Sequence, residues 1–257
     1  YNVAGNHDIN YDAKTRKHAN ETFERVYGPS YYSFDYGPVH FIVLDDIAWE
    51  IDGKTGKGSY HGGLGAEQIA FVKTDLEQIP DNQMVVLMMH IPINENKDRA
   101  PLFALLQEFP HTFSLSAHTH DQENRFLDAA QDWHGAQPHH HLVHATSCGV
   151  WWGGPFGENG IPLTPCGDGT PNGYSVISFN GANYSVEYHA AGFPAEFQMS
   201  LSLPDTVKPG EDTALVANVF AGSARSTVEM QVDGGAWTAM DRFTGKAPNY
   251  VQLYGRQ

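Results

Sequence analysis

The sequence has few cysteines, few basic residues and no long hydrophobic run. Its only cysteines, Cys148 and Cys166, lack the Cys-x-x-Cys spacing of zinc-finger and thioredoxin-type sites; they would form one disulfide in an exported protein or remain buried thiols. No segment approaches the roughly 18 consecutive apolar residues of a membrane span. Lysine and arginine number 15 against 30 acidic residues, and the resulting net charge of −15 argues against nucleic-acid binding. Neither a transmembrane segment nor a nucleic-acid partner is therefore expected.

The chain has two consecutive regions that differ in residue pattern. Residues 1–147 alternate apolar runs with amphipathic segments, which predicts an α/β layered domain. Helices are expected at 14–26, 66–79 and 98–109, strands at 31–36, 39–44, 84–89 and 112–117, and a glycine-rich loop at 50–63. Residues 148–257 begin with a Gly/Pro-rich stretch and continue with short strands at 174–179, 184–189, 196–203, 213–220 and 227–232. This second region is expected to be a small antiparallel β domain.

Polar side chains of the kinds that bind metals follow three apolar, strand-like runs. Asn6, His90 and the pair His118 and His120 all occupy such positions, and ligands of α/β sheets gather at the carboxyl ends of strands. On an extended backbone His118 and His120 would point to the same side, about 6–7 Å apart, which suits two metal ions about 3.5–4 Å apart. Histidine is the commonest metal ligand at neutral pH, and an asparagine amide oxygen suits divalent ions. The spacing therefore predicts a metal site.

These motifs resemble those of the calcineurin-like metallophosphoesterase superfamily. Gly5-Asn6-His7-Asp8 matches the Gly-Asn-His-Asp/Glu motif of that family, His90 matches its isolated histidine, and Ala117-His118-Thr119-His120 matches its Gly-His-x-His motif with alanine in place of glycine. Cys148–Trp152 and Asp168–Tyr174 resemble the junction to a C-terminal β domain in exported bacterial members. The resemblance is strong over 1–150 and weak beyond 190. It implies an α/β (α+β) layered sandwich core with a small antiparallel β domain, divided as 1–147 and 148–257.

The resemblance also implies how the metals are held. Asn6, His90 and His118 would bind one ion, and His120 would bind the other. Two divalent or trivalent ions, manganese, iron or zinc, would polarise a phosphoryl group and generate hydroxide from a bridging water. His7 would stabilise the transition state or protonate the leaving oxygen, with Asp8 orienting it.

The family also has two motifs upstream of Gly-Asn-His that supply the bridging aspartate and most ligands of the second metal. Only four residues precede Gly5, and Asp132-Trp133-His134 fits one of those motifs by its letters alone. The expectation is an N-terminally truncated member that is inactive or nearly so and holds at most one metal ion, weakly.

Several other residues are candidates for substrate contacts. His139-His140-His141 and His144 either line a cleft or a metal site, or mark the start of a strand with alternate faces exposed. Trp151 and Trp152, with Phe156, either form an aromatic wall for a sugar or lipid headgroup or pack the domain junction. The substrate-binding candidates are accordingly His140, His141, Trp151 and Trp152.

Two further patterns carry less weight. Asp45 and Asp46 are adjacent and would face opposite sides of a strand, so they do not form a catalytic acid pair. Ser116 near His118 does not indicate a serine hydrolase, because no Gly-x-Ser-x-Gly elbow is present.

The leading hypothesis is a metal-dependent hydrolase of phosphate mono- or diesters acting on small molecules or headgroups, secreted or periplasmic in a bacterium. The alternative is a glycan- or cell-envelope-binding protein with a vestigial metal site. The sequence leaves the substrate, the metal and the oligomeric state open.

Overall fold

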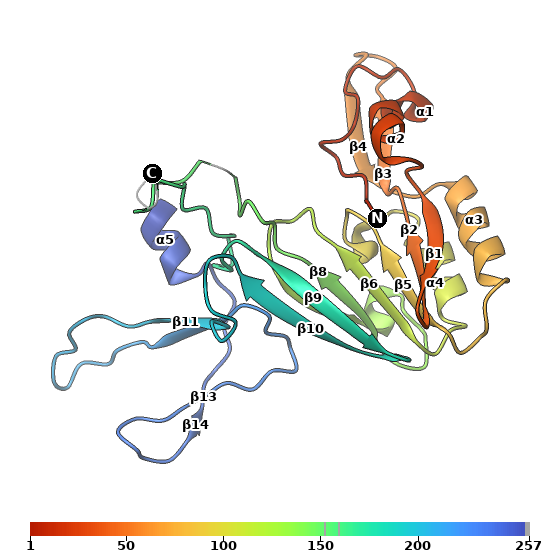
Figure 1. The fold of residues 1–257 in the computed structure, drawn as a ribbon. Coiled ribbons are helices and arrows are strands. Elements are labelled where there is room, and N and C mark those ends of the chain that lie inside the picture. Colours follow the sequence, from red (N-terminus) through yellow and green to blue (C-terminus); the bar gives the residue numbers. More distant parts are fainter. Residues whose placement is uncertain (152, 159, 255–257) are drawn as a thin grey trace. The chain divides into compact units, whose positions relative to one another are not determined.

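The computed structural model describes residues 1–151, 153–158 and 160–254 (Figure 1). Two compact units share the chain, and each is assembled from separate stretches. The first comprises Tyr1–Thr119, Arg125–Val143 and Ile177–Val186, and the second comprises His120–Asn124, His144–Val176 and Glu187–Gln257. A division of the chain at residue 147 stays a prediction. No helix in the described part of the chain is long and apolar enough to cross a membrane.

A mixed sheet of six strands, in the order β1-β2-β5-β6-β8-β7, forms the centre of the fold. The strands are β1 (Tyr32–Tyr36), β2 (Val39–Val43), β5 (Met84–Met88), β6 (Thr112–Ser116), β7 (Glu123–Leu127) and β8 (His139–Val143). β1 is antiparallel to β2, whereas β2, β5, β6 and β8 are mutually parallel neighbours. Apolar residues dominate β2 and β5 because both faces of these strands are covered. The parallel arrangement brings the carboxyl ends of β5 and β6 to one edge.

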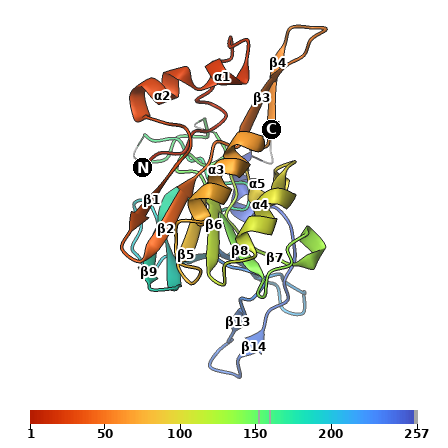
Figure 2. The ribbon, with the colours of Figure 1, turned by 90° about the vertical axis from the view of Figure 1, so that its right-hand side faces the viewer.

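Helices α3 (Ala66–Leu76) and α4 (Arg99–Leu106) cover one face of this sheet (Figure 2). Val72 and Leu76 of α3 are buried, and Ile69 and Ile79 pack against the same cluster, as the helical spacing predicts. The other helical elements of this unit are α1 (Arg16–Ala19), α2 (Glu21–Tyr27) and two short 3-10 turns, η1 (Ile93–Glu95) and η2 (Ala129–Gln131).

The end of a long β-hairpin covers the opposite face. β9 (Gly173–Asn180) and β10 (Asn183–Ala190) flank a turn at Gly181, whose φ of 60° suits glycine, and they confirm the strands predicted at 174–179 and 184–189. Four side chains of residues 177–186 pack on buried residues of the sheet: Ile177, Phe179, Tyr184 and Val186. Helices, sheet and hairpin end therefore form three layers, and the predicted layered α/β fold with additional small antiparallel sheets is confirmed.

Two predicted elements were wrong. The helix expected at 14–26 is divided at Asn20 into α1 (Arg16–Ala19) and α2 (Glu21–Tyr27). Asn20 is buried there, and its amide donates to Asp45 Oδ2 at 2.7 Å, a contact that sequence periodicity does not contain.

The segment expected to be a loop at 50–63 is largely a second hairpin, β3 (Ile47–Ile51) and β4 (Gly58–Gly62). Trp49 anchors it: the ring is buried, and its indole N–H donates to the carbonyl of Ala13 at 3.2 Å. The glycines that suggested a loop lie in the turn and beside this large ring, where a Cβ at Gly58 would overlap Trp49.

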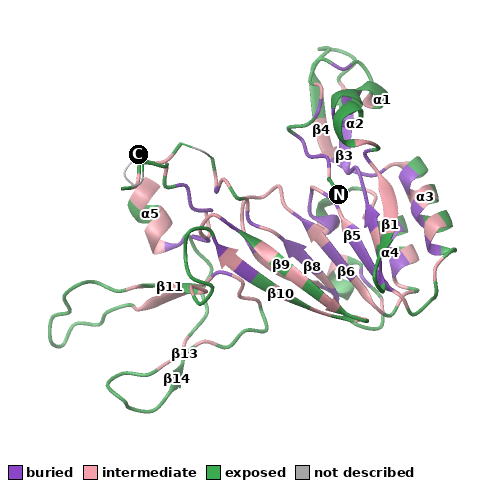
Figure 3. Cartoon of the chain, viewed as in Figure 1, coloured by how far each residue is buried: buried purple, intermediate pink, exposed green. Residues whose placement is uncertain are grey.

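The second unit contains shorter elements. β11 (Met199–Ser202) pairs with β12 (Val216–Val219), β13 (Glu229–Met230) pairs with β14 (Thr238–Ala239), and α5 spans Pro248–Tyr254. Its small core consists of Tyr188, Ala190 and Phe220, with Phe197 and Ala221 packed against it. Figure 3 shows that β11, β13 and β14, with the loops that flank them, are largely exposed or half-buried.

Candidate metal site

Three of the predicted ligands converge in the first unit. His90 Nε2 lies 2.7 Å from Asn6 Oδ1 and 3.1 Å from His118 Nδ1. His90 follows β5 and His118 follows β6, so the parallel pairing of these strands brings the two imidazoles to the same edge. Atoms bound to one ion at about 2.0–2.2 Å lie about 3 Å from one another, and both distances from His90 Nε2 are close to that value. These two distances therefore fit the first coordination sphere of a single ion.

Asn6 is buried and oriented by its other contacts. Its amide nitrogen donates to the hydroxyl of Tyr60 at 3.0 Å, which directs Oδ1 toward His90. Tyr11 donates to the backbone carbonyl of Asn6 at 2.9 Å. Gly5 permits the close approach, since a Cβ there would lie 3.0 Å from two ring atoms of His90. The glycine before Asn6 is thus required by the packing of the imidazole.

The backbone conformation at His118 and His120 differs from the prediction. Both residues have positive φ, 69° and 63°, so the strand ends before them and they are not on an extended backbone. For a residue with a Cβ, this conformation costs about 1–3 kcal/mol and is found mostly at functional sites. The Thr119 N–H donates to the carbonyl of Ala117 at 2.8 Å and closes the turn.

His120 belongs to the second unit and has contacts of its own there. Its Nδ1 lies 2.5 Å from the carbonyl oxygen of Val150, and because a carbonyl only accepts, Nδ1 carries the proton. The Nε2 atom is then the nitrogen with the lone pair that a metal needs. The exposed ring of Trp151 lies 5.3 Å from the imidazole of His120. Trp152, the other predicted aromatic contact, lies outside the described residues.

Asp46 fixes the backbone at His90 through hydrogen bonds. Its buried carboxylate accepts from the backbone N–H of His90 at 3.1 Å, from Ile91 N–H at 2.9 Å and from the amide of Asn96 at 3.2 Å. Burial raises the pKa of Asp46 to about 7, and these hydrogen bonds oppose the rise. The sequence offered no signal for this role, because adjacency to Asp45 only argued against an acid pair.

His7 and Asp8 are exposed beside Asn6. The Asp8 carboxylate accepts from the backbone N–H of Gly5 at 2.8 Å, and the Asp8 N–H donates to the carbonyl of Gly5 at 3.0 Å. Asp8 therefore closes the turn that carries Asn6. The leaving-group role of His7 and the orienting role of Asp8 stay predictions.

The histidine-rich segment is part of the sheet. His139 and His141 are buried within β8, with both ring nitrogens of each hydrogen-bonded to side chains of β6. Burial lowers the pKa of His139 to about 3 and that of His141 well below its usual value. His140 faces the opposite side, bonds the hydroxyl of Tyr184 at 2.6 Å and lies against Phe113. Substrate contacts by His140 and His141 stay a prediction that this geometry does not support.

His144 and the Asp132-Trp133-His134 segment also have structural contacts. His144 bonds the hydroxyl of Ser175 at 2.8 Å and its Nδ1 contacts the carbonyl of Ala145 at 2.6 Å. Asp132 pairs with Arg99 at 2.7 Å near the surface, and Trp133 is buried against α4. Both cysteines are free thiols.

Three of the predicted ligands of one ion lie close together in the described part of the chain. Among the described residues, no group of three or more His, Cys, Asp or Glu side chains is arranged to hold a metal. The set found here instead combines two imidazoles with an amide oxygen, a mixed set that iron, zinc and manganese tolerate.

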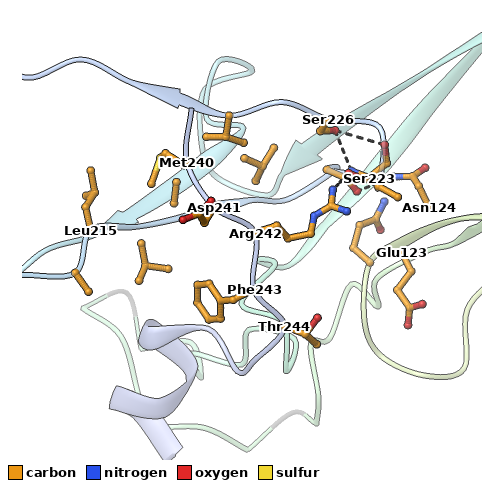
Figure 4. A pocket seen from close by; sticks show the side chains of 18 residues that line it. Glu123, Asn124, Leu215, Ser223, Ser226, Met240, Asp241, Arg242, Phe243 and Thr244 are labelled. Carbon is orange, nitrogen blue, oxygen red and sulfur yellow. Dashed lines mark hydrogen bonds between the residues drawn. The ribbon is translucent and has the colours of Figure 1, made fainter. Parts of the chain in front are cut away.

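The second unit contains a cavity of about 690 Å³ (Figure 4). Glu123, Asp241 and Arg242 are among its lining residues, and Arg242 donates to the carbonyl of Ser223. None of the site residues predicted from the sequence lines it.

Comparison with known proteins gives three findings. Residues 141–257 match the family model described as the C terminal of calcineurin-like phosphoesterase. A solved structure titled "Structure of PhoD" is similar to this chain, with a TM-score of 0.42 and 13% identity over 84% of this chain. The chain covers only 44% of that protein's length. No curated protein matches the sequence.

Proposed function

We propose that the chain is a calcineurin-like metallophosphoesterase in which Asn6, His90 and His118 hold the first ion. The match of residues 141–257 to the C-terminal model of that family supports the membership. The observation that supports this most is that the amide oxygen of Asn6 and a ring nitrogen of His118 both lie within 3.1 Å of His90 Nε2. Histidines that only fill a core bond hydroxyls or carbonyls, as His139 and His144 do here. At His90, by contrast, an amide oxygen and a second imidazole nitrogen approach the same ring nitrogen.

A bound ion would supply a Lewis acid for the phosphoryl oxygen and a hydroxide from water near neutral pH. Residues of the chain would hold the ion and transfer the proton. Asn6 and the two histidines would hold the ion, and the exposed imidazole of His7 would protonate the leaving oxygen. The turn closed by Asp8 holds His7 next to the ligand Asn6.

The finer parts of the proposal concern the second ion and the substrate. We propose that His120 contributes a ligand, through Nε2, to a second ion that is held only weakly, with manganese, iron or zinc at both positions. We also propose that Trp151 stacks on the organic part of the substrate. The substrates would be phosphate mono- or diesters of small molecules or headgroups. Residues 148–257 would form an accessory domain, and the protein would be exported. The resemblance of the sequence motifs supports these points.

A glycan- or envelope-binding protein is the second candidate, favoured by the exposed rings of Trp151 and Trp237. Asp8→Asn separates the two functions. Asparagine keeps an oxygen that accepts from Gly5 N–H but removes the charge near His7, so hydrolysis should fall while carbohydrate binding would not change.

The test measures metal-dependent hydrolysis of an aryl phosphate monoester and an aryl phosphate diester, with this chain and with any longer form of the protein that contains it. Hydrolysis that a chelator abolishes, that added metal restores and that His90→Asn eliminates supports the proposal. His134→Asn, an exposed histidine outside the site, is the control. Activity in no form under any metal would contradict the proposed function.

A further inference from the structure

Five side chains of β6 and β8 form a continuous hydrogen-bonded row, here called the Ser/His ladder. They belong to the face of the sheet covered by α4, since Trp133 packs against both His139 and Phe103. In order along the strands, the ladder joins Thr112, His139, Ser114, His141 and Ser116, with contacts of 2.8, 2.7, 2.6 and 2.9 Å. The ladder ends next to the turn that carries His118.

One additional contact fixes where each proton lies. The backbone N–H of Ile93 donates to His141 Nε2 at 3.3 Å, and a backbone N–H cannot accept. His141 Nε2 is therefore an acceptor, so the proton of this neutral imidazole lies on Nδ1 and is donated to Ser114. The Ser114 hydroxyl then donates to His139, and the Ser116 hydroxyl donates to His141 Nε2.

His141 Nε2 consequently accepts from both segments that carry the metal ligands. Ile93 lies three residues after His90, and Ser116 lies two residues before His118. The imidazole itself is fully buried and anchored at its other nitrogen by Ser114 at 2.6 Å. A rigid, buried ring thus ties the end of β6 to the segment that follows β5.

We propose that His141 is a positioning residue that sets the distance between the metal ligands His90 and His118. The role does not require contact with the ion or the substrate, and it explains why a polar ring occupies a core position that a leucine or valine would fill more favourably. The inference rests on the proposed function, because it assumes that these two imidazoles bind an ion. It also predicts that the two histidines of the ladder differ, since the ring nitrogens of His139 bond Thr112 and Ser114 instead.

The test compares Zn²⁺ affinity by calorimetry, and the absorption spectrum of bound Co²⁺, among matched variants of the full chain. An asparagine side chain ends near the place of histidine Nδ1, and a glutamine reaches the place of Nε2. His141→Asn therefore removes the acceptor for Ile93 and Ser116 but keeps the contact with Ser114. His139→Asn makes the same chemical change at the other end of the ladder.

His141→Asn should weaken Zn²⁺ binding by about tenfold, the lower end of the effect of residues that orient metal ligands, and alter the Co²⁺ spectrum. His141→Gln should recover part of the affinity. His139→Asn should destabilise the protein to a similar degree yet leave the affinity within about threefold.

Equal losses of affinity in His139→Asn and His141→Asn, or no loss in either, would overturn the inference. If His141→Asn does not fold, Ser116→Ala decides in its place: a loss of a few-fold supports the role, and unchanged affinity refutes it. Absence of Zn²⁺ binding by the unmodified chain would instead contradict the proposed metal site itself.

Discussion

The two units differ most in how completely they bury their side chains. In the first, Ile42, Leu87 and Phe113 have no exposed surface, and layers cover the sheet on both faces. In the second, Leu201 and Trp237 are more than half exposed, and the core consists of a few residues around Tyr188. The three converging ligands lie in the well-packed unit. Close packing allows atoms from distant segments to be held within a few tenths of an ångström, which a metal site requires.

The closer packing of the first unit also explains the buried hydrogen bonds next to the ligands. Asp46 and His141 are fully buried polar groups whose hydrogen-bonding atoms reach the segments of the ligands. Such groups are tolerated only where their partners are fixed, because an unsatisfied buried polar atom costs about 1–3 kcal/mol. A loosely packed unit could not hold them in place.

The largest difference should appear when one large side chain is removed from each unit. Phe103→Ala empties a fully buried position of α4 next to Trp133, and should lower the free energy of unfolding by about 3–5 kcal/mol. Phe243→Ala, at a position 63% exposed in the second unit, should change it by less than about 0.5 kcal/mol. Denaturant titration followed by circular dichroism measures both. Similar losses in the two variants would remove the contrast between the units.

Acid should destabilise the first unit through its buried histidines. Burial lowers the folded-state pKa of His139 to about 3, while the unfolded chain has the ordinary value of 6.5. The contribution is therefore fully present above pH 6.5 and is lost as the pH falls toward 3, by up to about 1.4 kcal/mol per pH unit. His141 acts in the same direction. Urea titrations at pH 7, 6 and 5 should show this decline in the free energy of unfolding. His139→Asn should reduce its slope with pH by the contribution of about one proton. A slope that His139→Asn leaves unchanged would contradict the buried neutral state.

A smaller and local effect is expected from Tyr188→Phe in the second unit. The Tyr188 hydroxyl donates to the carbonyl of Pro171, and its loss should cost about 1–2 kcal/mol. Hydrogen exchange should accelerate in β9 and β10 near residues 173–176 and 187–190 while β5 and β6 keep their protection. Equal acceleration in β5 would show that the units do not respond separately.

Much of the first unit could be predicted from the sequence. The continuous apolar runs indicated β2 and β5, the helical spacing indicated α3, and polar residues after apolar runs indicated Asn6, His90 and His118. His90 and His118 do follow strands, whereas residues 1–5 before Asn6 form no strand. These features depend on local pattern, because a strand that is covered on both faces must be apolar and ligands follow its carboxyl end.

The supporting contacts could not be predicted in the same way. Asp46 accepts from backbone N–H groups that lie 44 and 45 positions later in the sequence. The ladder joins β6 to a strand that begins more than 20 residues later. The glycine-rich composition of 50–63 concealed a hairpin because its anchor, Trp49, bonds a carbonyl far upstream. Positive φ at His118 and His120 was also missed, since two histidines separated by one residue suggest a strand.

The most direct measurement is the Zn²⁺ stoichiometry of this chain by calorimetry, compared with His118→Ala, His90→Ala and His120→Ala. The converging ligands predict one bound ion, lost in the first two variants and retained in His120→Ala, whose imidazole lies outside the set. Stoichiometry that is unchanged in His118→Ala and His90→Ala would contradict a metal site formed by Asn6, His90 and His118.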